Sequence, residues 1–70
     1  MKNRLEELRT KNGWTQQELA DRVEVSRQTI ISLENGRYNP SILLAFRLAH
    51  LFNLSIEGLF LYSGEEDNNG

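Results

Sequence analysis

The segment TQQELADRVEVSRQTIISLENG, residues 15–36, contains two helix starts only eleven positions apart. Thr15 and Ser26 are residues of the type that caps a helix N-terminus, because their side-chain oxygens accept hydrogen bonds from free backbone N–H groups. Glu18 follows Thr15 at the spacing of a capping box, in which the two residues cap each other. The segment therefore predicts two consecutive short helices.

The sequence also predicts where these two helices end. The first helical run ends at Val23, and the second ends at Asn35-Gly36, a pair typical of helix C-termini. A tight turn containing Val25 separates the two runs. A short helix followed by a tight turn holds the second helix at a steep angle to the first, and this arrangement leaves one face of the second helix exposed.

Three further helices are predicted outside this segment. They span Asn3 to about Lys11, Ser41 to about Phe52, and Ser55 to about Leu61. No run of alternating apolar and polar residues indicates a strand. The sequence therefore predicts an all-α fold of five helices, with residues 1–62 as one domain and residues 63–70 as an acidic tail that we expect to be disordered.

The fourth predicted helix is apolar around most of its circumference. The residues that cover this part are Ile42, Leu44, Ala45, Phe46, Leu48, Ala49, Leu51 and Phe52, and the remaining sector holds Leu43, Arg47 and His50. A helix of this kind is usually buried, so we expect it to form the centre of the core.

The third predicted helix has two different faces. At 100° per residue, Ile30 and Leu33 fall on an apolar face that we assign to the core. The other side is a strip of side chains that mostly donate and accept hydrogen bonds, made of Arg27, Gln28, Ile31, Ser32 and Asn35. The strip indicates a binding surface for a polar partner.

Composition excludes several other functions. The chain has no cysteine and a single histidine, His50, so it has no thiolate ligands and too few imidazoles for a zinc site. No carboxylate pair, nucleophile–base set or phosphate-binding loop is present, so we expect neither an enzyme nor a cofactor, metal or small-molecule ligand. The longest apolar run, residues 42–46, is too short to cross a bilayer, and no apolar segment follows the basic N-terminus. We therefore expect a soluble cytoplasmic protein.

The formal net charge is −2, which gives little support for an anionic partner. The distribution of the charges matters more than their sum, because Glu65, Glu66 and Asp67 all lie in the terminal tail. Residues 1–63 contain eight Lys or Arg and seven Asp or Glu, a net charge of +1. The predicted domain is therefore close to neutral, and its charge alone favours no class of partner.

These motifs resemble one known family. Thr15-Gln16-Gln17-Glu18-Leu19-Ala20, Val25-Ser26, Ile30 and Leu33-Glu34-Asn35-Gly36 are similar to the helix-turn-helix of the phage-repressor, Cro and Xre-like proteins. The similarity continues through Asn39-Pro40-Ser41 and Leu48-Ala49 to Leu54-Ser55-Ile56. It implies a lambda-repressor-like domain of five helices that binds operator DNA, usually as a dimer. The second helix would then cross the DNA backbone, and the third would enter the major groove.

On this interpretation the strip on the third helix reads the bases. Arg27 suits the O6 and N7 atoms of guanine, and Gln28 suits N6 and N7 of adenine, each through paired hydrogen bonds. Ser32 lies one turn further along. Ile31 is either a contact for a thymine methyl group or an ordinary exposed isoleucine.

Residues near the helix ends are expected to contact DNA phosphates. They are Gln16, Gln17, Asn35, Arg37, Tyr38 and Asn39. Gln16 begins the second helix, where free backbone N–H groups favour an anion and where the resemblance implies a phosphate contact. Arg37 adds positive charge, whereas Tyr38 is equally well explained as a cover over the core.

Two further contacts follow from the helix faces and the resemblance. Arg9 shares a helix face with Leu5, Glu34 lies at the core boundary of the third helix, and the family frequently pairs these positions. We therefore expect an ion pair between Arg9 and Glu34. Trp14, directly before a helix cap, is expected to pack against the next turn.

Apolar residues crowd the end of the fifth predicted helix. They are Leu59, Phe60, Leu61 and Tyr62. Core packing requires about half of them, and the rest would form an exposed patch through which two copies pair. A two-fold homodimer of this kind would recognise an inverted-repeat operator in double-stranded DNA.

Two function classes therefore compete. The first is a sequence-specific DNA-binding transcriptional regulator, most simply a repressor. The second is a small protein-interaction module whose apolar C-terminal helix binds a partner, and an antitoxin-like protein would combine both. The two classes differ in their need for Arg27 and Gln28, which only DNA binding requires.

Overall fold

The structure, a computed structural model, describes residues 3–60 of the 70-residue chain. Over this range it contains five α-helices and no strand, so the prediction of an all-α fold is confirmed. The helices are α1 (Leu5–Lys11), α2 (Gln16–Val23), α3 (Arg27–Glu34), α4 (Ile42–Leu51) and α5 (Ile56–Leu59). Leu61, Tyr62 and the predicted acidic tail lie outside the described residues.

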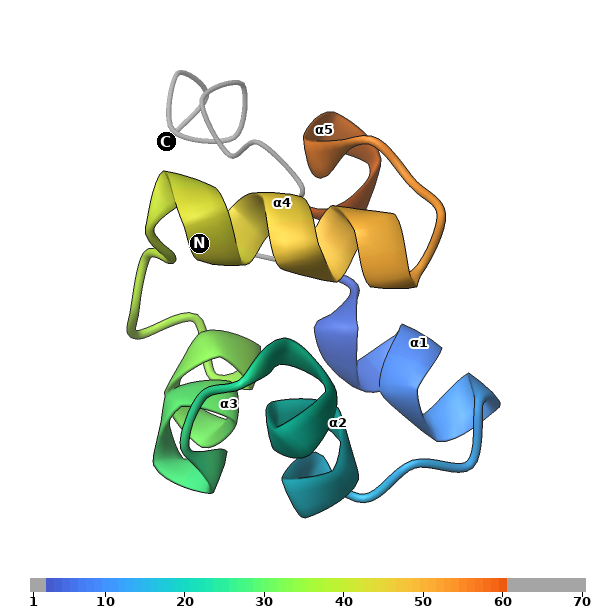
Figure 1. Cartoon of the computed structure of the whole chain (residues 1–70), viewed down its shortest axis with the longest axis vertical. Coiled ribbons are helices and arrows are strands. Elements are labelled where there is room, and N and C mark those ends of the chain that lie inside the picture. The colour runs from blue at the N-terminus through green and yellow to red at the C-terminus, as the bar shows by residue number, and fades with distance from the viewer. Residues whose placement is uncertain (1–2, 61–70) are drawn as a thin grey trace, which may run out of the picture.

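The helices α2 and α3 lie together at one end of the molecule, and α5 lies beyond α4 at the other end (Figure 1). α4 crosses between them and packs against α5 on one side and α2 on the other. α1 packs against α3. This arrangement places α3 at the edge of the domain, where only one of its faces is covered.

Side-chain caps begin four of the five helices. Thr15, Ser26, Ser41 and Ser55 each accept a hydrogen bond from the backbone N–H three positions further on. Thr15 and Glu18 form the complete capping box, with hydrogen bonds of 3.0 and 2.7 Å. α1 begins at Leu5 rather than at Asn3, because the side chain of Asn3 lies outside the helix and accepts from the backbone N–H of Leu5 at 3.0 Å.

Four helices are followed within two positions by a residue in the left-handed conformation. These residues are Gly13, Glu24, Gly36 and Asn53, with φ between 56° and 74°. After α3, for example, Gly36 N–H donates to the carbonyl of Leu33 and Arg37 N–H donates to that of Ser32, each at 3.0 Å. This pair of bonds closes the helix and turns the chain away from it. Glu24 is the one member of the four that is neither glycine nor asparagine.

A single hydrophobic core joins all five helices. Its completely inaccessible leucines and isoleucine are Leu5, Leu19, Ile30, Leu33, Leu48 and Leu59. Because every helix contributes to this one cluster, the position of α3 is set by the packing of the whole domain.

The expectation that the fourth helix is buried nearly all round is wrong. α4 buries Leu44, Ala45, Leu48 and Ala49 on one side. On the other side Ile42 is 77% exposed, Leu43 60% and Phe46 59%. The reason is the size of the domain, since α2 and α5 cover only part of α4 and no further element is available in the described chain to cover the rest.

Two of the four residues named for the expected dimer patch lie in the core, which is the share that core packing was expected to require. Leu59 and Phe60 belong to the core, with 0% and 6% of their surface exposed. α5 is only four residues long, and the backbone carbonyl of Leu59 accepts a hydrogen bond from the N–H of Arg4 at 2.9 Å. This contact joins the two ends of the described chain.

Candidate nucleic-acid interface

The turn between α2 and α3 is fixed at both ends. Glu24 takes the left-handed conformation, and the N–H of Val25 then donates to the carbonyl of Ala20 at 3.0 Å. Val25 packs against the core, and Ser26 directly caps α3. Because these three residues are each held by a specific interaction, the second helix starts immediately and at a defined angle. Because α2 ends early, α3 can begin at this angle and expose one of its faces.

The outward face of α3 carries the residues that the sequence singled out. Ile30 and Leu33 are buried on the inner side, whereas Arg27, Gln28 and Asn35 are exposed. Ile31 and Ser32 lie on the same outward strip and are half-buried.

Three polar side chains near this face have no hydrogen-bond or ion-pair partner within the described residues. Within residues 3–60, Arg27, Gln28 and Arg37 have exposed side chains with no side-chain hydrogen bond or ion pair. Arg4, Arg9 and Arg47, by contrast, each contact a carboxylate. The two free arginines can therefore bind an external anion or base edge without first breaking an internal contact.

A shallow hollow runs beside α3. It has a volume of about 240 Å³ and is lined by Ser26, Gln28, Thr29, Ser32 and Tyr38. Tyr38 is 45% exposed and forms one wall of the hollow. This hollow was not predictable from the sequence, because it depends on how the segment after α3 lies against the helix.

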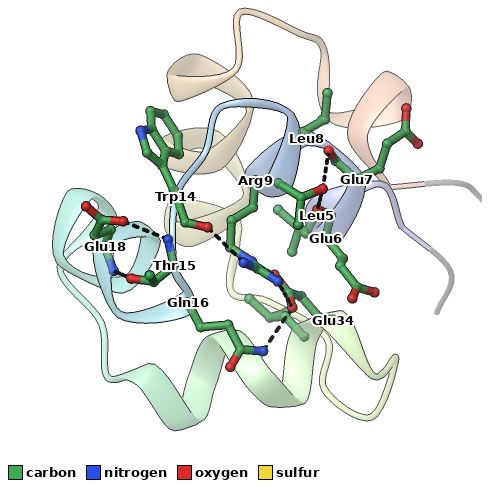
Figure 2. A network of polar contacts seen from close by, with 12 residues as sticks. Leu5, Glu6, Glu7, Leu8, Arg9, Trp14, Thr15, Gln16, Glu18 and Glu34 are labelled. Atoms are coloured by element: carbon green, nitrogen blue, oxygen red, sulfur yellow. Dashed lines mark hydrogen bonds and ion pairs between the residues drawn. The ribbon is translucent and has the colours of Figure 1, made fainter.

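An ion pair fastens α1 to the end of α3. Arg9 Nε donates to Glu34 Oε2 at 2.6 Å, and Arg9 Nη2 donates to Glu34 Oε1 at 3.3 Å (Figure 2). The side chains are 11% and 4% exposed. The hydrogen bond to Glu34 raises the pKa of Arg9 above its usual value, so the guanidinium stays charged. Arg9 and Glu34 are thus placed as the sequence and the resemblance led us to expect.

The same ion pair is the centre of a larger network. Arg9 Nη1 donates to the backbone carbonyl of Trp14 at 2.8 Å, and Gln16 Nε2 donates to Glu34 Oε1 at 3.1 Å (Figure 2). The network therefore joins α1, the residue before the α2 cap, the first residue of α2 and the last residue of α3. This internal contact of Gln16 was missed by sequence reasoning, because it depends on the packing of two helices.

The remaining expected phosphate contacts lie on the surface. Gln17 is exposed, and its Nε2 donates to Asp21 Oδ1 one helical turn further on, at 2.9 Å. Asn35 and Asn39 are exposed near the C-terminal end of α3. The expected residues thus fall into two groups, one at the start of α2 and one after α3.

The ring of Trp14 contacts two side chains, those of Phe52 and Arg22. Its ring centroid lies 5.7 Å from that of Phe52, and the guanidinium of Arg22 lies 4.2 Å from its ring centroid. Trp14, which precedes the α2 cap, therefore links Arg22 of α2, through a cation–π contact, to Phe52 at the end of α4.

No cluster of three or more metal-ligating side chains occurs among residues 3–60. Likewise, none of the described helices has the length and apolar character needed to span a membrane.

Two short helices joined by a tight turn, with a polar strip on the outer face of the second, define a helix-turn-helix protein. Residues 5–59 match the family model described as helix-turn-helix. The chain belongs to this family, which is a family of regulators rather than of enzymes.

Similar proteins occur in archaea and bacteria. The chain is 52% identical over 66 residues to an uncharacterized HTH-type transcriptional regulator of Archaeoglobus fulgidus, and the match covers 94% of each protein. It is 47% identical over 66 residues to another such regulator of Methanocaldococcus jannaschii, covering 94% of this chain and 100% of that protein. It is 46% identical over 65 residues to the competence pilus inhibition repressor of Acinetobacter baylyi, covering 90% of this chain and 57% of that protein.

Proposed function

We propose that this protein is a sequence-specific DNA-binding transcriptional regulator, acting as a repressor, that reads the major groove with α3. The observation that carries the proposal is the exposed strip on α3, where Arg27 and Gln28 have no internal partner. The network around Glu34 holds the far end of the same helix. A helix that is held rigidly and has free polar side chains suits base recognition, because binding then costs little conformational entropy.

Base reading is assigned to four residues of α3. Arg27 and Gln28 lie in its first turn and are the most exposed, so they reach furthest into the groove when the helix enters by its N-terminus. Arg27 is assigned to a guanine and Gln28 to an adenine. Ile31 and Ser32 are half-buried and their side chains are shorter, so they are assigned to bases that come close to the surface of α3. Ile31 is assigned to a thymine methyl group.

Phosphate binding is assigned to two groups of residues on either side of α3. Gln16 and Gln17 stand at the start of α2, and the second group consists of Asn35, Arg37, Tyr38 and Asn39. Gln16 uses one amide hydrogen for Glu34, which leaves the other hydrogen and the first backbone N–H groups of α2 for a phosphate oxygen. The Glu34 contact thereby orients the amide before DNA arrives.

We further propose that two copies act together on an inverted-repeat operator. One α3 reads only a few base pairs, and a two-fold dimer doubles the site by placing two such helices about 34 Å apart, one turn of DNA. The protein would work in the cytoplasm, where that DNA is located.

The experiment is selection of bound sequences from random duplex DNA at a stated salt concentration. Wild-type protein should enrich an inverted repeat, and the Arg27→Ala/Gln28→Ala double variant should enrich nothing while keeping its helical circular-dichroism spectrum. Folded wild-type protein that enriches no sequence would reject DNA reading. A protein-interaction module would bind its protein partner equally well with or without the side chains of Arg27 and Gln28.

A further inference from the structure

The segment that follows Phe60 contains the only run of three consecutive acidic residues in the sequence. Residues 61–70 include Glu65, Glu66 and Asp67 and no Lys or Arg, so this segment has a net charge of −3. The place where the described chain ends determines which cation these carboxylates can meet.

The end of the described chain lies close to the C-terminal end of α3. The carbonyl of Leu59 accepts a hydrogen bond from the backbone N–H of Arg4 at 2.9 Å. The preceding residue, Asn3, donates from its side chain to the carbonyl of Leu33 at 2.7 Å. Two consecutive residues therefore bridge the end of α5 and the last turn of α3.

A hollow gives a second measure of this proximity. Phe60 and Asn39 line the same hollow, which has a volume of about 280 Å³. Arg37 is two positions before Asn39, a step of at most about 7.6 Å along the chain. Glu65 is five positions after Phe60, which gives a reach of roughly 17 Å when the chain is extended. The acidic run can therefore reach Arg37 from the end of the described chain.

Arg37 is a cation in this region with no internal partner. Its backbone N–H donates to the carbonyl of Ser32 at 3.0 Å, whereas its side chain is exposed and makes no hydrogen bond or ion pair within residues 3–60. Both carboxylate oxygens of Glu34, the nearest acidic residue in the sequence, are already occupied by Arg9 and Gln16. No other Asp or Glu occurs before Glu57. The fixed backbone and free guanidinium of Arg37 are therefore available to an acidic partner.

We propose that the acidic run Glu65, Glu66 and Asp67 pairs with Arg37 and competes with DNA phosphate for it. This deepens the proposed function, on which it rests, by adding an intramolecular competitor at the same site. Because the run is attached to the domain, its effective concentration near Arg37 is in the millimolar range at any protein concentration. A pair on the surface is weak, so DNA displaces the acidic run, and the competition lowers affinity only severalfold.

Salt should weaken this competition. The ion pair is exposed, and the screening length falls from about 10 Å at 0.1 M salt to about 3 Å at 1 M. The acidic run should therefore reduce DNA affinity most at low salt. A variant without its three charges should show a steeper salt dependence of DNA binding than wild type.

The first test measures DNA affinity with and without the three charges. Glu65→Gln/Glu66→Gln/Asp67→Asn should raise affinity for the preferred duplex about twofold to fivefold at low salt, as expected for the loss of an exposed ion pair. At roughly 1 M salt the gain should vanish.

The same three substitutions in an Arg37→Ala background are the matched control. There they should give no gain at either salt concentration, whereas in an Arg37→Lys background, which keeps the positive charge, the gain should persist. An equal gain with and without a cation at position 37 would show that the acidic run repels DNA in general, and it would overturn the pairing with Arg37.

The second test needs no DNA and therefore separates this proposal from DNA reading. In the NMR spectrum of the free protein, the side-chain Nε–H signal of Arg37 should shift when the three charges are removed. The signal of Arg27, which is also exposed and lies at the other end of α3, should stay in place. An unchanged Arg37 signal would overturn the ion pair, and a shifted signal with unchanged DNA affinity would overturn the competition. A shifted signal in a protein that binds no duplex would support the ion pair and reject DNA reading.

Discussion

Arg9 and Glu34, which are 25 positions apart in the sequence, share two hydrogen bonds of 2.6 and 3.3 Å in a nearly solvent-free setting. Each side chain is the main charge partner of the other, so neither charge is satisfied alone. Because Glu34 is the last residue of α3, the pair fixes α3, the helix that carries the exposed strip, relative to α1.

Removing one member of this pair should be strongly destabilising. Arg9→Met would leave the Glu34 carboxylate buried without its cation, at a cost of about 3–5 kcal/mol in the free energy of unfolding. Arg9→Met/Glu34→Leu should recover most of that loss, since apolar replacements of similar volume are tolerated. Urea denaturation of the four proteins in a double-mutant cycle measures the coupling. Additive effects of the two substitutions would contradict a coupled pair.

Glu24 should be replaceable with a gain in stability. Its φ of 62° and ψ of 44° lie in the left-handed region, where a side chain costs about 1 kcal/mol or more relative to glycine. The contact it makes with Arg47, 3.8 Å long and on the surface, contributes little in return. Glu24→Gly should therefore stabilise the domain by about 0.5–1 kcal/mol, which raises the midpoint of thermal unfolding by a few degrees.

The control for this prediction is Glu24→Ala. Alanine also removes the Arg47 contact but keeps the Cβ atom that causes the strain, so it should give no comparable gain. A destabilised Glu24→Gly variant would show that the left-handed turn is not strained by its side chain.

The helices were predictable because their signals are local. Thr15, Ser26, Ser41 and Ser55 act within three residues of themselves, so the sequence alone locates the starts of these four helices. The inner face of α3 follows in the same way from its periodicity.

Features that depend on packing between helices were not predictable. The contact of Gln16 with Glu34 arises only once α2 and α3 are docked, and the exposure of Phe46 depends on which side of α4 the helices α2 and α5 cover. The apolar run from Leu59 to Tyr62 indicated that about half of it belongs to the core, but it could not tell which half, and the structure buries Leu59 and Phe60. The pairing of Arg9 with Glu34 was expected because the family resemblance supplied the partner.

Arg37 should set the salt dependence of DNA binding without affecting base preference. It is exposed and unpaired, and it follows the C-terminal end of α3, away from the first turn that is assigned to base reading. Each phosphate neutralised on B-DNA contributes about −0.9 to the slope of log K against log salt concentration. Arg37→Ala should therefore weaken binding to all sequences by a similar factor and make the slope less negative by about 1.

Affinities measured at several salt concentrations, on the preferred site and on unrelated duplexes, test this prediction. Arg4→Ala is a control, because Arg4 is paired with Glu7 at 3.1 Å and lies on α1's side of the domain. A change in base preference with Arg37→Ala would assign Arg37 to base reading instead.

Arg27 should determine one base pair in each half-site. It is the first residue of α3, exposed and without an internal partner, so its guanidinium is free to make two parallel hydrogen bonds to one guanine. Arg27→Ala should cost about 1–3 kcal/mol of binding free energy on the best site and relax preference at that single position. The free energy of unfolding should stay within about 0.5 kcal/mol of wild type, since no core contact is lost. The decisive measurement is the affinity of Arg27→Ala and wild type for the preferred site and for each of its single-base substitutions. Should Arg27→Ala weaken every duplex by the same factor, Arg27 binds phosphate, and base reading at the start of α3 passes to Gln28, whose replacement by alanine would then produce the position-specific loss.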